Sequence, residues 1–339
     1  MNVLIVRPDG IGDLVLSLPV ATQLRQLMPG VRIGVLANPV AAPILEHHSD
    51  IDYVRTVSLQ ASIPDMMQAF SGGIDAVIFL KPFRRLMWAA WRAGIPLRVA
   101  TGFRWQSVLA NRWIHEHRSS FQKHESDCNV EMLKGLRLTP LPVAAPTLQL
   151  TEVERAEGGR RWVGAALPRV VIHPGGVSAR HWRPAQYRDL AQTLAQQGYA
   201  VVLTGSQVER DQFQSEALDG IVLHPEINNL MGQLAIRELM AVIGAAHVVV
   251  SGATGPAHLA AALHVPTVSL FDPRRNNSPT RWKPLGRGVL LRPDVPTCDK
   301  CIGEACAYWD CLDRFSVEDI AARLGAVVRS AQPLTIHHI

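Results

Sequence analysis

Short apolar runs of strand length alternate with segments of helical spacing along most of the chain, and a proline-dense stretch divides them into two series. The first series extends to about Arg137. Strand–helix alternation is typical of parallel sheets joined by right-handed crossovers, so the pattern predicts an α/β protein. The candidate strands of this series are Val3 to Val6, Val31 to Leu36, Tyr53 to Val57 and Ala76 to Leu80.

The stretch T-P-L-P-V-A-A-P-T, residues 139–147, is typical of a linker, and the second series begins at Arg169. We therefore predict two Rossmann-like domains facing each other across a cleft, at residues 1–145 and 146–315, followed by a C-terminal helix and tail at 316–339. We expect Thr335 to Ile339 to be a loose end. The strands and helices expected in this part are Val170 to His173, Pro184 to Gln197, Ala200 to Leu203, Ala235 to Ile243, Val248 to Ser251, Thr267 to Phe271 and Val317 to Val328.

Composition excludes a membrane-spanning protein. Of the 339 residues, 47% are hydrophobic and 19% are charged, and no apolar run is long enough to cross a bilayer. Arg7 interrupts the first apolar run and no basic region precedes it, so we expect no signal peptide and a cytoplasmic location. In that compartment the five cysteines are expected to be free or metal-bound rather than paired in disulfides.

Asp13 stands where the first strand hands over to a helix, after a glycine-bearing turn at residues 8–12. In open α/β sheets this edge faces the ligand crevice, where a carboxylate can act as a base on a bound hydroxyl. Aspartate is also favoured at helix N-termini for capping, so position alone leaves both roles open. Val15 occupies the place of the third glycine of the dinucleotide fingerprint, and we therefore expect no NAD site here.

The second series opens with the turn H-P-G-G-V-S-A-R-H-W-R-P, residues 173–184. Gly175 and Gly176 allow backbone N–H groups to approach an anion, and Arg180 adds a fixed positive charge. An ordinary strand-to-helix connection would have the same local pattern.

A second turn, within residues 250–263, follows a run of valines and opens a helix rich in small residues. Thr254, Gly255 and the helix N-terminus make a seat for a diphosphate, and His258 lies in the first turns of the same helix. Two such turns in one domain, one of them carrying Arg180, favour a nucleotide-diphosphate site.

Together these motifs resemble glycosyltransferase family 9, the ADP-heptose:lipopolysaccharide heptosyltransferases and their relatives, over nearly the whole chain. The resemblance rests on the order and spacing of several motifs. It implies a GT-B architecture, an acceptor bound by the first domain, a nucleotide sugar bound by the second, and inversion at the anomeric carbon without a catalytic metal or other cofactor. The motifs are G-D-L-V-L-S-L-P, H-P-G-G…R-H-W, L-T-G-S-Q-V-E-R, N-L-M-G-Q-L, T-G-P-A-H-L-A-A-A-L-H-V-P-T-V-S-L-F-D-P and the cysteine-rich stretch before the last helix.

The resemblance also implies roles for individual residues. Asp13 matches the proposed base of the family, and Glu209 lies in the segment that approaches the nucleoside. Thr254, Gly255 and His258 match the T/S-G-x-x-H element at the diphosphate. These assignments imply ADP-heptose as the donor and a lipopolysaccharide core or related glycan as the acceptor.

Two positions depart from the family pattern. Arg180 falls where heptosyltransferases usually have a lysine that holds the donor phosphates. Ala253 stands where the family commonly has an aspartate before the Thr or Ser. Both departures touch the donor pocket, so the identity of the sugar and of the nucleotide base is less constrained than the fold or the reaction type.

Cys298, Cys301, Cys306 and Cys311 have the spacing C-x2-C-x4-C-x4-C, whereas Cys128 stands apart. Four thiolates this close in sequence suit one tetrahedral zinc or iron ion, which would be structural because the protein supplies all its ligands. A reduced loop without an ion is the alternative.

The segment from Lys81 to Lys123 is strongly basic, with nine Lys or Arg residues and a single acidic residue, Glu116. One interpretation is a solvated basic surface over a tryptophan-containing core. The other is a surface for an anionic, lipid-linked or core-oligosaccharide acceptor at the inner face of the membrane. The candidate anion ligands are Arg84, Arg85, Arg98 and Arg104, and the tryptophans of the segment are Trp88, Trp91, Trp105 and Trp113.

Three other functions remain open at this point. The chain could be another GT-B enzyme, such as a nucleotide-sugar epimerase, or a transferase acting on a protein or small glycan. A nucleic-acid-binding protein using the cysteine segment is disfavoured, because Cys298 to Cys311 contains one basic residue, Lys300, beside three acidic ones. We therefore expect no nucleic-acid partner.

Overall fold

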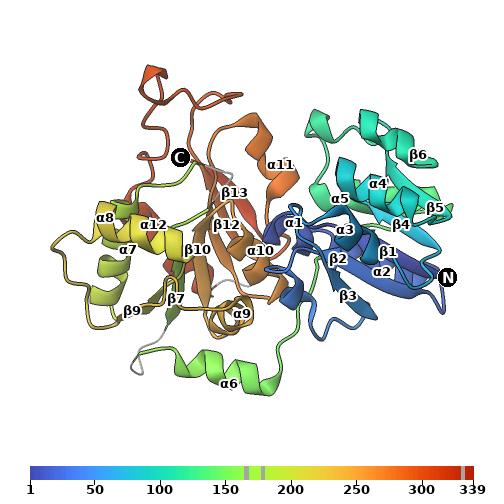
Figure 1. Cartoon of the computed structure of the whole chain (residues 1–339). Helices are drawn as coiled ribbons and strands as arrows, with labels where there is room; N and C mark the ends of the chain where they lie inside the picture. Colours follow the sequence, from blue (N-terminus) through green and yellow to red (C-terminus); the bar gives the residue numbers. More distant parts are fainter. Residues whose placement is uncertain (164–167, 177–179, 330–332) are drawn as a thin grey trace. The chain divides into compact units, whose positions relative to one another are not determined.

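The computed structural model describes residues 1–163, 168–176, 180–329 and 333–339, and it divides into two compact units, Met1–Gln149 and Leu150–Ile339 (Figure 1). Each unit is built on a parallel sheet with helices beside it, which confirms the expected α/β class with two Rossmann-like halves. The middle of the first glycine turn of the second half, residues 177–179, lies outside the described residues. We describe each unit by itself.

The first unit contains a six-stranded parallel sheet in the order β3-β2-β1-β4-β5-β6. Its central strands are apolar and buried on both faces, as expected for a parallel sheet covered by helices. The strands are β1 Asn2–Val6, β2 Arg32–Ala37, β3 Tyr53–Thr56, β4 Ala76–Phe79, β5 Leu97–Thr101 and β6 Arg112–Ile114.

Short helices connect these strands. The expected first helix is divided in two, because Ser17 begins a second helix with Pro19 in its first turn, where a proline is tolerated. The helices are α1 Ile11–Val15, α2 Leu18–Leu27, α3 Ile63–Gln68, α4 Arg84–Arg92 and α5 Glu125–Val130, with 3₁₀ helices η1 Ala42–Leu45, η2 Trp105–Leu109, η3 Arg118–Ser120 and η4 Glu131–Leu136.

The second unit contains a seven-stranded parallel sheet in the order β13-β12-β11-β10-β7-β8-β9. With β7 taken as its first strand, the order outward on each side repeats that of the first unit and adds β13 at one edge. The strands are β7 Arg169–His173, β8 Ala200–Leu203, β9 Ile227–Asn229, β10 Val248–Gly252, β11 Thr267–Leu270, β12 Gly288–Arg292 and β13 Thr335–His338.

Helix ends in this unit follow from local sequence. Ser206 and Glu209 form a reciprocal capping box at the start of α8, and Thr151 with Glu154 does the same for α6. The helices are α6 Glu152–Arg160, α7 Pro184–Gln196, α8 Gln207–Ala217, α9 Ile236–Gly244, α10 Gly255–Ala262, α11 Pro279–Trp282 and α12 Val317–Arg329, with 3₁₀ helices η5 Arg275–Asn277 and η6 Gly303–Ala305.

The C-terminal residues correct one expectation. Residues 335–338 form strand β13, which pairs in parallel with β12, so this segment is not a loose end. The backbone N–H of Ile339 donates to the carbonyl of Arg292, and that of Asp294 donates to the carbonyl of Ile339. The strand is held by these backbone bonds and not by burial, because its side chains are exposed.

The strand orders place the ends of β1 and β7 at matching positions. In each unit the chain reverses direction across the sheet beside that first strand, between β1 and β4 and between β7 and β10. Ligands of open α/β sheets bind outside the carboxyl ends of the strands at such a switch point. Each predicted site residue of this group lies in the turn or the first helical turn that follows a strand bordering one of the two switch points. These residues are Asp13, Gly175, Gly176, Thr254 and Gly255.

Candidate functional site

A buried ionic network lies at the carboxyl end of β1. Arg7, the residue after the strand, is 3% exposed, and its guanidinium pairs with the carboxylates of Asp13, Asp9 and Glu125. The pairs with Asp9 and Glu125 measure 2.8 and 3.0 Å. Asp13 is 26% exposed, compared with 11% for Asp9 and 1% for Glu125. Asp13 is therefore the carboxylate of this network with the greatest access to a bound molecule.

The surroundings of Asp13 make it a better base than an ordinary surface carboxylate. Burial raises the pKa of Asp13, the positive charge of Arg7 lowers it, and the negative charges of Asp9 and Glu125 raise it again, so that the pKa lies above its usual value. General-base catalysis is most effective when the pKa of the base approaches the working pH. The short helix α1 begins after Gly10 and carries Asp13 in its first turn.

In the second unit, the turn after β7 passes close to α8 and to the turn after β10. A Cβ atom on Gly175 would overlap the Glu209 carboxylate, and one on Gly176 would overlap both the Thr254 methyl group and the His181 ring. Gly176 also has a φ of +147°, which L side chains rarely adopt. Only glycine at these positions allows Glu209, Thr254 and His181 to lie directly against the backbone of the turn.

The partly exposed Glu209 and the buried His173 lie close together beside this turn. His173 Nε2 lies 4.0 Å from Glu209 Oε1, and its Nδ1 lies 3.1 Å from the hydroxyl of Thr204. Burial lowers the pKa of His173 to about 4, so the imidazole is neutral at pH 7. Burial opposes ionisation of Glu209, but its interaction with His173 and hydrogen bonds from Ser206 and Gly176 outweigh burial and lower its pKa. Glu209 is therefore a carboxylate that accepts hydrogen bonds from the turn itself.

Thr254 caps the N-terminus of α10 with an extended backbone, and its side chain makes no capping hydrogen bond. Its hydroxyl oxygen is buried and has no hydrogen-bond partner among the described residues. Gly255 and Pro256 open the helix, and His258 follows one turn later and is 5% exposed. A buried hydroxyl at a helix N-terminus, beside a glycine turn, is suited to bind an anionic group.

His181 also belongs to this cluster, although the sequence motifs assign it no role. Its ring lies against the positions that Cβ atoms on Gly176 and Gly252 would occupy. Neither ring nitrogen makes a well-aligned hydrogen bond with a described residue, and burial lowers the pKa of the imidazole despite the nearby backbone of Gly176. The sequence signal was its place after Arg180 in the triplet R-H-W, where the arginine is the more obvious phosphate ligand.

The side chain of Arg180 lies elsewhere. Its backbone N–H donates to Asp272 Oδ2 at 2.8 Å, while its guanidinium donates to the carbonyl of Trp309. The same guanidinium lies 3.7 Å from the sulfur of Cys301 and 3.8 Å from that of Cys311. In this structure Arg180 therefore joins the glycine turn of the sequence to the cysteine segment and does not contact Thr254.

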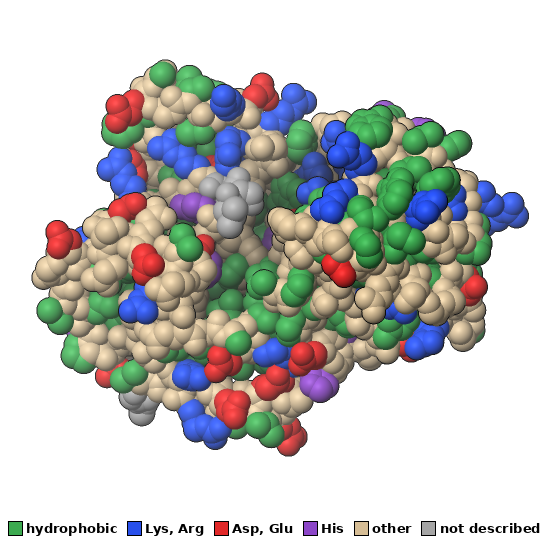
Figure 2. All heavy atoms as spheres, in the orientation of Figure 1, with side chains coloured by type: hydrophobic (Ala, Val, Ile, Leu, Met, Phe, Trp, Pro, Cys, Tyr) green, Lys and Arg blue, Asp and Glu red, His purple; other side chains and the backbone are tan. Residues whose placement is uncertain are grey.

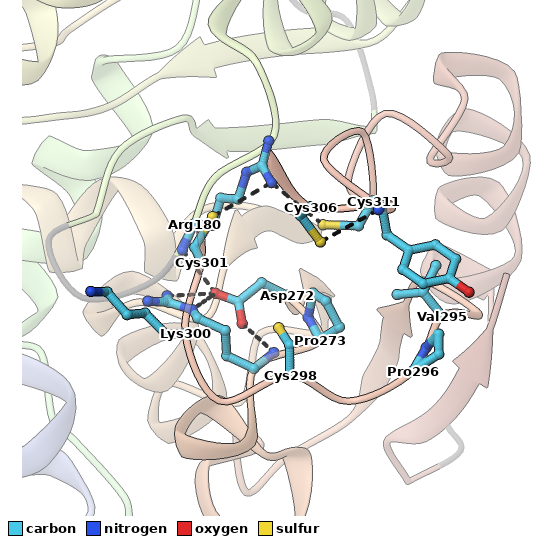
Figure 3. Close-up of a pocket in the computed structure, with 12 residues that line it drawn as sticks. Arg180, Asp272, Pro273, Val295, Pro296, Cys298, Lys300, Cys301, Cys306 and Cys311 are labelled. Carbon is cyan, nitrogen blue, oxygen red and sulfur yellow. Dashed lines mark hydrogen bonds and ion pairs between the residues drawn. The ribbon is translucent and has the colours of Figure 1, made fainter. Parts of the chain in front are cut away.

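All four cysteines of the predicted cluster line one hollow of about 410 Å³, part of it open to solvent (Figure 3). Four thiols are a suitable donor set for zinc or iron, but among the described residues no three potential ligands stand close enough to hold an ion. Burial raises the pKa of Cys298 and of Cys311, so both are protonated thiols at neutral pH. The other residues lining the hollow are Arg180, Asp272, Pro273, Arg274, Val295, Pro296, Lys300 and Tyr308.

The four predicted acceptor arginines have two different environments. Arg85 donates to the carbonyls of Leu59 and Ala61, and Arg98 donates to those of Leu109 and Ile95, so these two side chains hold neighbouring loops. Arg84 and Arg104 are exposed. Arg84 stacks over Trp105, with its guanidinium carbon 6.0 Å from the ring centre.

The tryptophans of the same segment are exposed and do not belong to the core. Their exposed fractions are 37% for Trp88, 47% for Trp91, 72% for Trp105 and 54% for Trp113. Within the described parts of the chain, no helix combines the length and apolar character needed to span a bilayer.

Comparison with known proteins gives concordant matches. The family model described as glycosyltransferase family 9 (heptosyltransferase) matches residues 74–308. A putative glycosyltransferase of Haemophilus influenzae is 26% identical over 312 residues, covering 84% of this chain and 86% of the relative. Lipopolysaccharide heptosyltransferase 1 of Pseudomonas aeruginosa is 25% identical over 325 residues, covering 91% of this chain and 88% of the relative.

A solved structure shares the fold across both units. Escherichia coli ADP-heptose LPS heptosyltransferase II superposes with a TM-score of 0.79 at 21% identity, covering 97% of this chain and 98% of the other. This likeness supports the expected GT-B fold class.

Proposed function

The chain belongs to glycosyltransferase family 9, the heptosyltransferase family, and from this premise we propose that it transfers heptose from ADP-heptose to a lipopolysaccharide core or related glycan, with inversion. One observation carries the proposal. Two turns that follow β7 and β10 meet beside the buried hydroxyl of Thr254, which has no hydrogen-bond partner among the described residues, at the switch point of a Rossmann-like sheet. Such a place suits the diphosphate of a nucleotide sugar.

The second unit binds the donor in this proposal. Backbone amides at Gly175, Gly176 and Gly255, the Thr254 hydroxyl and the neutral His181 imidazole donate hydrogen bonds to the diphosphate. The Glu209 carboxylate cannot receive an anion, but it can accept hydrogen bonds from the hydroxyls of a ribose. These groups stabilise the negative charge that develops on the departing diphosphate. The assignments of His258 and Arg180 to the same anion remain part of the proposal.

The first unit supplies the base. Asp13 takes the proton of the acceptor hydroxyl, whose oxygen forms a bond to the anomeric carbon. The bond from that carbon to the diphosphate oxygen breaks, and its electron pair leaves with ADP. The anomeric carbon inverts because attack and departure occur on opposite faces, through a transition state that resembles an oxocarbenium ion. In this proposal, transfer requires that Asp13 and the groups that bind the diphosphate act in the same reaction.

Product analysis tests this proposal. The full chain is incubated with ADP-heptose and a truncated lipopolysaccharide core, and mass spectrometry and anomeric coupling constants identify the product. We expect one added heptose, one ADP released per transfer and an inverted anomeric centre. Rapid ADP release without acceptor would contradict a transferase. Preference for a UDP- or GDP-sugar would refute the donor and leave the reaction class intact, an outcome that Ala253 makes worth testing.

We also propose that the four clustered cysteines bind one structural zinc or iron ion. The donor set supports this, and loading would draw the thiols together and release their protons. Elemental analysis of protein purified under reducing conditions without added metal is expected to find about one equivalent. Cys306→Ser should lose the ion, whereas Cys128→Ser, at the cysteine outside the cluster, should retain it. Freshly purified, reduced protein without metal would reject the proposal.

The acceptor is proposed to be anionic and to bind the first unit near the inner face of the cytoplasmic membrane. Exposed Arg84 and Arg104 are the candidate ligands of its phosphates, while the guanidinium groups of Arg85 and Arg98 donate to backbone carbonyls. Arg84→Ala and Arg104→Ala are expected to raise the KM for the acceptor more than the KM for the donor. An equal effect on both constants would contradict this role.

A further inference from the structure

The outward face of α4 is unusual for a surface helix. Positions 84, 88, 91 and 92 lie on one side of the helix, and all four are exposed: two arginines and two tryptophans. The opposite side is filled by Leu86, Met87, Ala89 and Ala90, which are buried. A helix that packs its apolar side inward normally presents charged and small polar residues to water. Here large aromatic rings occupy half of the outward positions.

Two further elements extend this surface. η2 packs against α4 and is tied to its start by a hydrogen bond from Gln106 Nε2 to the carbonyl of Pro82, 2.9 Å long. β6 is the edge strand of the sheet, and the indole N–H of Trp113 donates to the carbonyl of Ser107 in η2 at 2.8 Å. Trp105 and Val108 of η2 are 72% and 74% exposed. The three elements therefore present one continuous surface.

We call this surface the aromatic–basic face. Figure 2 shows hydrophobic and basic side chains gathered over this part of the first unit. Its members are Arg84, Trp88, Trp91, Arg92, Phe103, Arg104, Trp105, Val108, Arg112 and Trp113.

The charge of the face is of one sign. No acidic residue occurs between Asp75 and Glu116 in the sequence. The arginines of the face form no ion pair with a carboxylate in the part of the chain that the structure describes. Two of them stack on tryptophans of the face, Arg84 on Trp105 and Arg92 on Trp88. The other basic side chains of the segment are engaged elsewhere, as when Lys123 pairs with Glu116. The exposed cations are thus available to an anionic partner.

We propose that the aromatic–basic face docks the enzyme on an anionic lipid bilayer, with its indole rings at the headgroup level and its guanidinium groups on lipid phosphates. The inference rests on the proposed function in one respect, because a lipid-linked acceptor would place the enzyme at a bilayer. Tryptophan is favoured at membrane–water interfaces, and basic side chains are attracted to anionic leaflets. Exposed indole rings interspersed with guanidinium groups that have no carboxylate partner among the described residues match the interface of an anionic bilayer, where the rings contact the headgroup region and the cations contact lipid phosphates.

Sedimentation with vesicles tests the proposal. The full chain is mixed with vesicles of phosphatidylcholine alone or with phosphatidylglycerol added, at low and high salt. We expect binding to the anionic vesicles that weakens as salt rises. Arg92→Glu combined with Arg112→Glu should reduce binding by about fivefold or more for each charge. The matched control is Arg155→Glu with Arg160→Glu, at exposed arginines of α6.

The aromatic contribution needs its own variants. Trp91→Ser with Trp105→Ser should reduce vesicle binding by about tenfold even at high salt, where charge is screened. Trp309→Ser is the matched control, because Trp309 is 43% exposed and also lies beside an arginine, Arg183. Lipids brominated on their acyl chains should quench tryptophan fluorescence of the wild type and quench it less in the double variant. Thermal melting and ADP affinity of each variant report on folding and on the donor site separately.

Several outcomes would overturn the docking surface. They are vesicle binding that ignores lipid charge and salt, face variants that bind like the wild type, or binding abolished equally by Trp309→Ser. A change of oligomeric state in the face variants would instead assign the surface to a second copy of the chain. Failure of docking with normal sugar transfer leaves the proposed function intact, and failure of transfer with normal docking leaves the surface intact.

Discussion

The turns at the carboxyl ends of β1 and β7 occupy equivalent places in two sheets with corresponding strand orders, but their residues differ in kind. The first is filled with buried charge: one arginine holds three carboxylates, and Asp13 is the most exposed of these. The second contains glycine backbone and the neutral imidazoles of His173 and His181, and it meets the turn after β10, where the buried hydroxyl of Thr254 has no hydrogen-bond partner among the described residues. In the proposed function, the first of these turns supplies the group that accepts a proton, and the second binds an anion.

The difference follows from what each kind of site requires. A base needs a carboxylate whose pKa is not strongly lowered by its counter-ion, and burial together with the charges of Asp9 and Glu125 raises the pKa of Asp13 despite its pair with Arg7. An anion site needs backbone N–H groups that a ligand can approach, and at Gly176 the side chains of Thr254 and His181 leave no room for a Cβ atom. Glu209 also lies beside this turn, and its carboxylate is occupied by hydrogen bonds from the backbone.

The largest effect is expected from Asp13→Asn. The amide cannot take a proton, so turnover should fall by about 10²- to 10⁴-fold while fold and donor binding are retained. Asp9→Asn is the matched control, because it removes a carboxylate from the same arginine without removing the proposed base. Steady-state transfer assays compare the two variants. Similar losses of turnover in both variants, or near-normal turnover in Asp13→Asn, would contradict the assignment of Asp13 as the base.

Closing the anion site should have the next largest effect. Gly176→Ala places a Cβ atom against Thr254 and His181, so calorimetry should show ADP affinity reduced by about 10- to 100-fold, the worth of one or two hydrogen bonds to a charged group. Gly159→Ala in α6 is the control, since nothing lies near its added Cβ atom, and it should leave affinity unchanged. Unchanged affinity in a well-folded Gly176→Ala protein would show that the turn does not hold the diphosphate.

The lowered pKa of the buried His173 predicts a smaller effect, a loss of folding stability at acidic pH. The pKa of His173 is about 4 in the folded chain and about 6.5 when unfolded, so the unfolded state binds the proton first as pH falls. Stability is thus complete above about pH 6.5 and is lost between there and pH 4, by roughly 2 kcal/mol at pH 5. Chemical denaturation at pH 7 and pH 5 should show this loss reduced in His173→Gln. The exposed control His117→Gln should keep the full loss.

The central strands of both sheets could be predicted from sequence, because strands such as Val3 to Val6 are apolar on both faces. Strands at the margins could not. β6, with sequence R-W-I, and β9, with sequence I-N-N, have no apolar alternation, and they join their sheets through backbone pairing with distant segments. Strand β13 could not be predicted either, because its side chains are exposed and it joins the sheet through backbone hydrogen bonds.

The site shows a similar division. The sequence predicted that Asp13 follows a strand. It could not predict the ionic network around Arg7, because Arg7 and Glu125 are separated by 118 residues. Residue type alone places tryptophan in cores, whereas α4 already fills its inner side with smaller apolar residues and leaves Trp88 and Trp91 outside. The direction of the Arg180 side chain, toward the cysteine segment, likewise depends on contacts with residues far along the chain.

One titration series tests most directly whether the first unit supplies the base while the second unit binds the donor. ADP is titrated calorimetrically into the wild type, Asp13→Asn and Thr254→Val. Valine is nearly the same shape as threonine, so Thr254→Val removes the buried hydroxyl with little change in packing. The account predicts that Asp13→Asn binds ADP as the wild type does and that Thr254→Val binds it about tenfold more weakly. Wild-type affinity in Thr254→Val, or an equal loss in Asp13→Asn, would contradict it.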